Sequence, residues 1–164
     1  MDVNGFKGPN SEARNGKQYD IRSFKVARFS TGCPGKDVDG IGCVYVPPSY
    51  SGIKAGSEEM DKWDPNWTHE KVPGYWFYYD NYWAGAKKAC DELGMSLPDK
   101  SKLQSLAKKI TVAEKEQLGL PTYGWFWSSS EDSAGYAYSV FFYSGGTHLN
   151  DKYYSDSKVL CVGD

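Results

Sequence analysis

An ordered series of short motifs in the second half of the chain sets the narrowest limits on its fold. The series contains, in order, Trp83–Cys90, Leu93–Pro98, Trp125–Glu131 and Val159–Val162. It places one cysteine on an expected helix and a second on the last expected strand, with a segment rich in Tyr, Ser, Asp and Gly between them. We interpret this pattern as a scaffold with structural cysteines that presents a recognition surface, and it contains no catalytic motif.

The first expected helix starts at Asp80 or Asn81, either of which is a good N-cap, and extends to about Leu93. Gly94 suits the C′ position after a helix, where a positive φ is common. Apolar residues recur at helical spacing on one face, and Cys90 belongs to that face. We therefore expect Cys90 to point into the core.

A second helix and several strands are expected after the first helix. Asp99 or Ser101 can cap a helix with apolar residues at helical spacing, and Gly119 marks a later stop. Farther along, the pattern favours strands, with Gly145–Gly146 as a hairpin turn. The expected strands are Trp125–Trp127, Tyr136–Tyr143 and Val159–Val162. The predicted order is helix, helix and an antiparallel meander that ends with the strand containing Cys161.

The first half of the chain has a different character. Residues 1–48 favour short strands and turns, with strands expected over 21–29 and 41–46. Residues 49–73 are polar and irregular, which is typical of a surface connection with one short helical turn. We divide the chain into a β-rich segment over 1–50, a connection over 51–74 and a main domain over 75–164.

The cysteine content bears on the compartment. The chain contains Cys33, Cys43, Cys90 and Cys161. An even number in a chain rich in Tyr, Gly and Asn favours two disulfides and an oxidising environment, and the alternative is four buried free thiols in a cytosolic protein. Cys33 and Cys43 flank a short loop with Pro and Gly, so a local disulfide is geometrically reasonable. Since no C-x-x-C pair occurs, we expect neither a zinc ribbon nor a thioredoxin-type site.

Charge and composition argue against three classes of protein. The net charge is −2 with acidic and basic residues interspersed, which is unlike a nucleic-acid-binding protein. No apolar run is long enough for a membrane span, so a secreted form would have its targeting segment outside this sequence. Disordered chains are poor in aromatic residues, whereas 13 Tyr and 6 Trp among 164 residues indicate a folded chain.

From about residue 75 to 164, the chain resembles bacterial C-type lectin-like domains of the Lcl C-terminal type. The motifs that carry the resemblance occur in the right order and are the helix with Cys90, Gly94–Pro98, two helix leucines, Trp127–Glu131 and Val159–Val162. The resemblance implies an α+β, C-type lectin-like fold of two helices and an antiparallel sheet. It also implies a ligand-binding or adhesive role and a disulfide between Cys90 and Cys161.

Two further resemblances concern the ends of the chain. The tail Gly146–Lys158 is similar to targets of diversity-generating retroelements, which randomise mainly Asn, Tyr, Ser and Asp codons on C-type lectin-like scaffolds. Asp2–Asn10, followed by Gly16, Asp20 and Phe24, resembles the β-region of type IV pilin-like and pseudopilin-like proteins. The second resemblance implies that the long apolar helix of those proteins has been removed and that the lectin-like domain is carried on a pilin stalk.

We expect no enzymatic activity and no cofactor. His69 and His148 lie far apart in sequence and have no nucleophile motif beside them. Formylglycine-generating enzymes share the C-type lectin-like fold but need paired active cysteines, and here those cysteines are interpreted as structural. The calcium motifs of sugar-binding C-type lectins are absent. Glu131–Asp132 and Asn150–Asp151 could offer oxygen ligands to calcium, but solvated loop acids are the favoured interpretation.

The segment from Ser128 to Lys158 is dense in Tyr, Ser, Gly, Asp and Asn, the composition that antibody paratopes use. The aromatic runs Tyr75–Tyr79 and Trp125–Trp127 offer a sugar-stacking platform, although we expect at least half of these rings in the core. The alternative for the segment is a polar loop region without a partner. The predicted ligand-binding residues are Tyr136, Tyr138, Tyr143, His148, Asn150, Asp151, Tyr153, Tyr154 and Asp156.

The sequence thus predicts a secreted or surface-displayed module that binds a protein or glycan ligand, in the extracellular space or on a cell surface. The alternative from another class is a structural minor pilin-like subunit that contacts pilus subunits and has no ligand of its own. An enzyme on the same fold is a third, weaker hypothesis.

Overall fold

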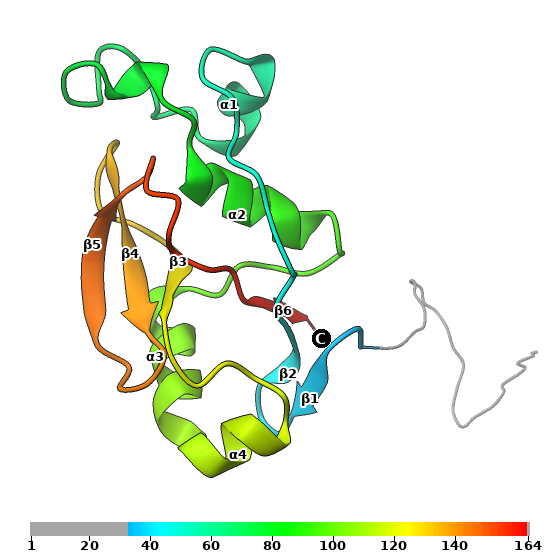
Figure 1. Ribbon diagram of the computed structural model, residues 1–164. Coiled ribbons are helices and arrows are strands. Elements are labelled where there is room, and N and C mark those ends of the chain that lie inside the picture. Colours follow the sequence, from blue (N-terminus) through cyan, green and yellow to red (C-terminus); the bar gives the residue numbers. More distant parts are fainter. Residues whose placement is uncertain (1–32, 164) are drawn as a thin grey trace, which may run out of the picture. The chain divides into compact units, whose positions relative to one another are not determined.

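The computed structural model describes residues 33–163 (Figure 1). The chain divides into two compact units, 1–34 and 35–164, and the fold described below is that of the second unit. The predicted strand over 21–29 and the pilin-like motifs of residues 2–24 lie outside the described residues. Among residues 33–163, no helix has the length and apolar character needed to cross a membrane.

Two antiparallel sheets and several helices build this unit, which confirms the α+β class (Figure 1). One sheet has the order β1-β2-β6 and the other has the order β3-β4-β5. The strands are β1 (Lys36–Val38), β2 (Gly42–Tyr45), β3 (Trp125–Glu131), β4 (Tyr136–Phe141), β5 (Thr147–Asp151) and β6 (Cys161–Gly163). The helices are α1 (Glu58–Trp63), the short 3-10 helix η1 (Trp76–Tyr78), α2 (Tyr82–Asp91), α3 (Lys100–Lys109) and α4 (Val112–Gln117).

Local capping signals account for the helix boundaries. The Asn81 side chain accepts a hydrogen bond from the backbone N–H of Ala84 and caps α2, and Gly94 has a φ of 71° just beyond its end, as predicted. Asp99 caps α3 in the same way. Where one helix was expected before Gly119, the structure has two, because Thr111 and Glu114 form a capping box that begins α4.

The position of the last strand differs from the prediction. β6 does not continue the meander. It pairs with β2 in the other sheet, with Val162 opposite Val44, and the third strand of the meander is β5. The segment before β6 passes along β3, where Lys158 forms a parallel bridge with Phe126, and β6 continues beyond it to β2. Consequently β1 and β2, which we assigned to a separate segment over 1–50, belong to the same unit as the helices.

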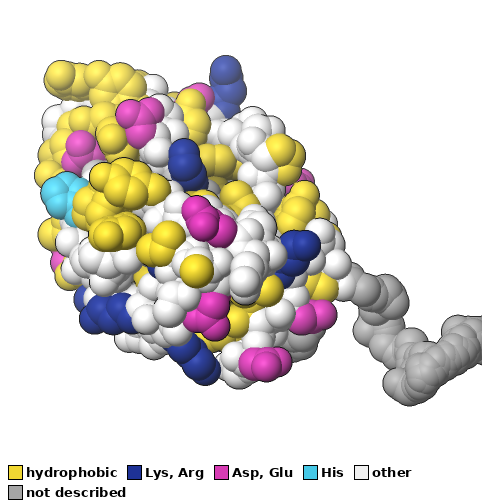
Figure 2. Space-filling view, turned by 60° about the horizontal axis from the view of Figure 1, so that its bottom comes forward, with side chains coloured by type: hydrophobic (Ala, Val, Ile, Leu, Met, Phe, Trp, Pro, Cys, Tyr) yellow, Lys and Arg dark blue, Asp and Glu magenta, His cyan; other side chains and the backbone are white. Residues whose placement is uncertain are grey.

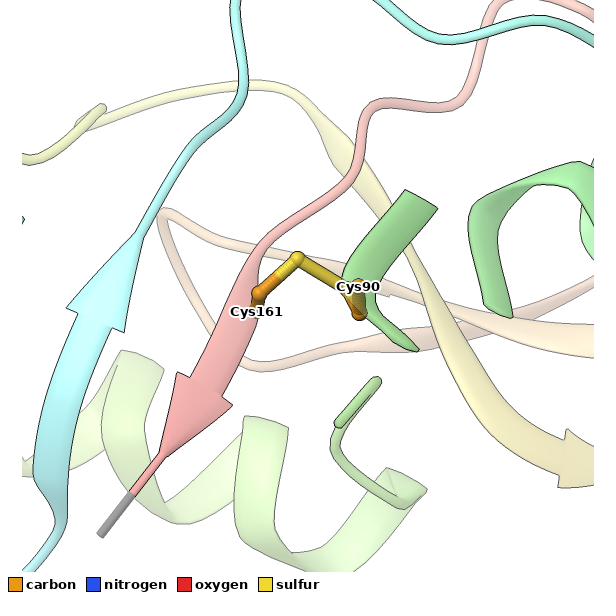
Figure 3. Close-up of a disulfide and its surroundings, with 2 residues drawn as sticks. All are labelled: Cys90 and Cys161. Atoms are coloured by element: carbon orange, nitrogen blue, oxygen red, sulfur yellow. A yellow bond between two sulfur atoms is a disulfide. The ribbon is translucent and has the colours of Figure 1, made fainter. Parts of the chain in front are cut away.

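A disulfide joins Cys90 of α2 to Cys161 of β6, with 5.4 Å between the Cα atoms (Figure 3). Both cysteines are fully buried, so Cys90 points into the core as expected. The bond closes a loop with a sequence separation of 71 residues, which in the chain-entropy picture stabilises the fold by about 4 kcal/mol. Cys33 and Cys43 are also disulfide-bonded, so no cysteine within residues 33–163 is free.

The main core lies between α3 and the two sheets. Leu103 and Leu106 of α3 pack with Phe126 of β3, Val140 of β4 and Val44 of β2, and all of these side chains are fully buried. Burial of each such side chain contributes about 1.5–3 kcal/mol. This core positions β3 and β4 rigidly and therefore fixes the face that they share with β5.

A second core contradicts the interpretation of residues 49–73 as a surface connection. Ile53, Met60, Trp67 and Val72 are buried together against Ala84 of α2. Ile53, Met60 and Trp67 are seven positions apart, which is a helical spacing, but only Glu58–Trp63 of this segment is an α-helix, so a helical period does not account for their burial. The predicted helical turn is present as α1.

Candidate functional site

The structure separates the predicted ligand-binding residues into groups. His148, Asn150, Asp151 and Tyr154 line one pocket together with Trp125, and its volume is about 330 Å³. We call this the Trp125 pocket. Tyr136 and Tyr153 lie elsewhere, around Trp76. The remaining predicted residues, Tyr138, Tyr143 and Asp156, do not line the pocket.

Strand register builds the Trp125 pocket. β4 lies between β3 and β5, with Trp125 opposite Phe141 on one side and Ser139 opposite His148 on the other. The Trp125 and His148 rings are consequently 5.5 Å apart, centroid to centroid. After β5 the chain turns back, and the backbone N–H of Tyr154 donates to the Asp151 carbonyl at 2.9 Å. This turn brings Tyr154 to the pocket.

Buried hydroxyl groups hold Asn150 in one orientation. Its Nδ2 donates to Ser139 Oγ at 2.8 Å and to Ser157 Oγ at 3.0 Å, and both serines are buried. The Tyr50 hydroxyl donates to the Ser157 carbonyl at 2.6 Å and accepts from Trp127 Nε1. The amide nitrogen of Asn150 is thus used inside the protein. Its oxygen is left as the polar group for the pocket.

Tyr50 is itself shaped by this environment. Burial, more than any neighbouring charge, raises the pKa of Tyr50 to about 12, although the hydrogen bond from Trp127 lowers it. The phenol therefore stays neutral and remains a donor to the tail over the whole physiological range. The wall of the pocket on the Ser157 side is fixed by neutral hydrogen bonds.

Exposed aromatic rings lie next to the pocket. Tyr123 packs on Phe141 at 4.9 Å and lies 6.1 Å from Tyr143, while Trp125 lies 5.0 Å from Phe141. We call these four residues the aromatic rim. Tyr123 is 67% exposed and Tyr143 is 56% exposed. Figure 2 shows hydrophobic side chains gathered around a histidine on one face of the molecule. Large exposed apolar groups of this kind mark interaction surfaces.

The second group surrounds Trp76 of η1. Tyr136 and Tyr153 pack edge-on against Trp76 at 5.3 and 4.9 Å, and Tyr79 lies 4.9 Å from Tyr153. Burial, together with the Asp151 carboxylate, raises the pKa of Tyr153. Trp76 and Tyr153 also pack against the second core. Tyr136 and Tyr153 therefore serve packing, at least in part, and do not belong to the Trp125 pocket.

Tyr138 and Asp156 do not line the pocket and do not pack around Trp76. Tyr138 donates a hydrogen bond to Asp132, and the Lys100 ammonium lies over the Tyr138 ring, 4.0 Å from its centroid. The Asp132 carboxylate raises the pKa of Tyr138. Asp156 acts beside the pocket, because it adds to the effect of burial in raising the pKa of Tyr154.

The aromatic runs are less buried than the sequence suggests. Phe126 and Trp127 are fully buried, but Tyr75, Tyr78, Tyr79 and Trp125 are exposed. Trp76 and Phe77 are half-buried. Trp125 and Trp127 share one face of β3, so the alternation of a strand does not tell which of them is covered. Trp125 is the pocket residue that sequence reasoning left out of the predicted set.

Lys152 lies in the polar tail and is nevertheless fully buried. Its Nζ lies 3.0 Å from Asp64 Oδ2 and also pairs with Glu131. Asn81 donates to the same Asp64 oxygen at 2.7 Å. The Trp83 ring lies 4.4 Å from the Lys152 ammonium. This buried ion pair connects the end of β5 to the segment after α1 and is structural.

The histidines have aromatic neighbours. His69 Nε2 is 2.7 Å from the Tyr78 hydroxyl, and His148 lies beside Trp125. Within residues 33–163, no group of three or more His, Cys, Asp or Glu side chains is arranged to hold a metal ion. The chemistry that the Trp125 pocket offers is stacking and hydrogen bonding, with donor groups on His148 and Tyr154 and an acceptor on Asn150.

Comparison with known families decides the relationship of the chain. Residues 77–163, more than half of the sequence, match a family described as Domain of unknown function (DUF8780). The chain belongs to the DUF8780 family. The DUF8780 region begins inside η1 and ends with β6, so it includes every residue of the Trp125 pocket and the Cys90–Cys161 disulfide. No curated protein and no solved structure matches the chain.

Proposed function

We propose that this protein is a ligand-binding or adhesion module whose binding site is the Trp125 pocket with its aromatic rim. The observation that carries the proposal is the pocket itself, in which His148, Asn150 and Tyr154 converge with Trp125. These side chains come from β3, from β5 and from the turn after it, which the core and the buried Asn150 hydrogen bonds hold in place.

The chemistry of the surface supports recognition of a macromolecule. Tyr and Trp supply a large contact area at a low cost in conformational entropy, and Asn and Ser supply hydrogen bonds. A site built on fixed strands loses little further freedom when a ligand binds, so a larger part of the interaction energy appears as affinity. Tyr123, Tyr143 and Tyr154 remain well exposed and are available to a partner.

The experiment compares the oxidised protein with the double variant His148→Ala/Tyr154→Ala on immobilised panels of glycans and of purified surface proteins. We expect at least one panel member to bind the wild-type chain and to lose most of its binding to the double variant. Because both side chains are exposed, the free energy of unfolding should change by about 1 kcal/mol or less. The control is Val112→Ala, an exposed apolar residue on α4 outside the pocket.

Two results would contradict the proposal. One is a ligand that binds the double variant as tightly as it binds the wild-type chain. The other is a panel on which the wild-type chain binds nothing while the control proteins of the panel are bound by their own partners.

We also propose that the fold is C-type lectin-like and that the protein works outside the cytoplasm. The disulfide from α2 to the final strand, and the pairing of that strand with β2 near the start of the unit, support the fold. The disulfide bonds support an oxidising compartment. Diversification of the tail by a retroelement remains a proposal, which a neighbouring reverse transcriptase gene with a near-copy of the 3′ end of this gene would support.

A further inference from the structure

We propose that the Trp125 pocket binds an arginine side chain presented by a partner protein. This inference rests on the proposed function and names the chemistry of its ligand. It follows from three features of the pocket, namely its hydrogen-bond acceptors, its aromatic rings and its charge.

The polar groups that Asn150 and Asp151 offer are acceptors. The amide nitrogen of Asn150 is committed to Ser139 and Ser157, so the side chain presents its oxygen. Asp151, the next residue on β5, also lines the pocket, and its half-buried carboxylate lies beside it, on the side of the strand where it raises the pKa of Tyr153. An acceptor in the pocket and a carboxylate beside it suit a ligand with several N–H donors.

Aromatic rings supply the second feature. Trp125 and Tyr154 line the pocket and are 37% and 41% exposed, so both rings have surface available to a ligand. A planar guanidinium stacks on aromatic faces and is attracted by their π electrons, with Trp the strongest partner. A compact ammonium gains less from stacking and donates in no fixed plane.

The charge balance favours a cation. Among residues 33–163, no lysine or arginine lines the pocket, whereas the Asp151 carboxylate lies beside it and Asp156 lies near Tyr154. Lys152 is buried on its ion pair with Asp64, and the Lys158 side chain runs over Gly124, within 3.3 Å of where a Cβ would be. A neutral sugar can donate hydroxyl hydrogen bonds to a carboxylate, but only a cation such as a guanidinium also gains the attraction between opposite charges.

The surroundings favour a protein as the source of the guanidinium. The aromatic rim extends the apolar surface beyond the pocket. A free amino acid would leave this surface uncovered. A partner protein that inserts an arginine would bury it, as a polar anchor inside an apolar contact does at other interfaces.

The test is a titration of the isotope-labelled, oxidised full chain, followed by the backbone and indole N–H signals in two-dimensional NMR. The probes are N-acetyl-arginine methylamide, the citrulline analogue that has the same shape without the charge, the lysine analogue, choline and methyl glucoside. We expect the arginine probe to shift the signals of Trp125, His148, Asn150 and Tyr154 with a dissociation constant in the millimolar range. The citrulline probe should bind at least about five-fold more weakly, and added salt should weaken the arginine probe.

Two isosteric variants locate the effect. Asp151→Asn should weaken the arginine probe about five-fold or more, because it removes the negative charge beside the pocket. Asp132→Asn makes the same chemical change at a carboxylate outside the pocket, which accepts a hydrogen bond from Tyr138, and it should leave binding of the arginine probe unchanged.

Each contrary result overturns the inference. Such results are no shift with the arginine probe, equal binding of the citrulline, lysine or choline probe, and unchanged binding to Asp151→Asn. A shift with methyl glucoside and none with arginine would leave the proposed binding function standing and reject the arginine ligand. A chain that binds no probe here and no member of the panels above would reject both proposals.

Discussion

Replacing Lys152 with methionine should cost the protein a large part of its stability. Lys152 Nζ lies 3.0 Å from Asp64 Oδ2, and the two side chains are 0% and 1% exposed. Methionine keeps the unbranched, apolar stem and removes the charge, so the packing against Trp83 is largely preserved. The buried Asp64 carboxylate then loses its counter-ion.

The magnitude follows from what Asp64 retains. Removing one partner of a buried ion pair costs about 3–5 kcal/mol, because the other charge stays buried without compensation. Asp64 keeps hydrogen bonds from Asn81 Nδ2 at 2.7 Å and from the backbone N–H of Asn66 at 3.2 Å. We therefore expect a loss of about 3 kcal/mol for Lys152→Met, the lower end of that range.

The assay is equilibrium unfolding of the oxidised protein in guanidinium chloride, with an exposed ion pair of this chain as the control. Lys88 contacts Glu59 at 2.7 Å, but their side chains are 30% and 53% exposed. Lys88→Met should cost about 1 kcal/mol or less. The second variant, Lys152→Met/Asp64→Asn, removes both charges and should recover part of the loss.

The reasoning is refuted if Lys152→Met costs no more than Lys88→Met. It is also refuted if Asp64→Asn adds a further loss in the Lys152→Met background, since the buried charge would then not be the cause.

Three further predictions concern the scaffold. Replacing Cys90 and Cys161 with alanine should lower the free energy of unfolding by about 4 kcal/mol, measured by denaturant unfolding against the oxidised wild type. Gly85→Ala should destabilise the protein even though alanine is the better helix former, because its Cβ would lie 2.0 Å from the Ser51 carbonyl oxygen; a rise in melting temperature would contradict the clash. The pKa of the Tyr50 phenol is near 10 in the unfolded chain and about 12 in the folded protein. Its contribution to the free energy of unfolding is therefore complete below pH 10 and is lost as the pH rises toward 12. Tyr50→Phe should remove this part of the alkaline loss of stability, measured by denaturant unfolding between pH 9 and pH 12.

The parts of the fold that the sequence predicts correctly depend on short-range chemistry. The cap at Asn81, the glycine at residue 94 and the hairpin at Gly145 each involve residues within a few positions of one another. Side chain and backbone interact there whatever the rest of the chain does, so the residue types alone carry the information.

The parts that the sequence does not predict depend on residues far away. β6 contains Cys161 and Val162, whose apolar character fits either sheet, and only β2, more than a hundred positions earlier, decides its partner. Lys152 lies in a polar tail and gives no sign of burial without Asp64. Trp125 and Trp127 have the same place in the strand alternation, but the cover over Trp127 includes Tyr50, to which it donates a hydrogen bond.

The burial of some tail residues and the exposure of others yield a prediction about the candidate site. The tail from 147 to 158 contains both exposed and buried positions. His148, Leu149 and Tyr154 are exposed, whereas Lys152 and Ser157 are fully buried. A library randomised over these twelve positions, displayed and selected only for resistance to protease, should therefore keep Lys152 and Ser157 and accept most residues at the exposed positions. Since protease resistance reports folding and not binding, the pattern separates the two roles. Free variation at Lys152 and Ser157 would show that the tail is not anchored by these buried contacts, and strong retention of His148 or Tyr154 would show that these side chains support the fold and are not free to serve a ligand.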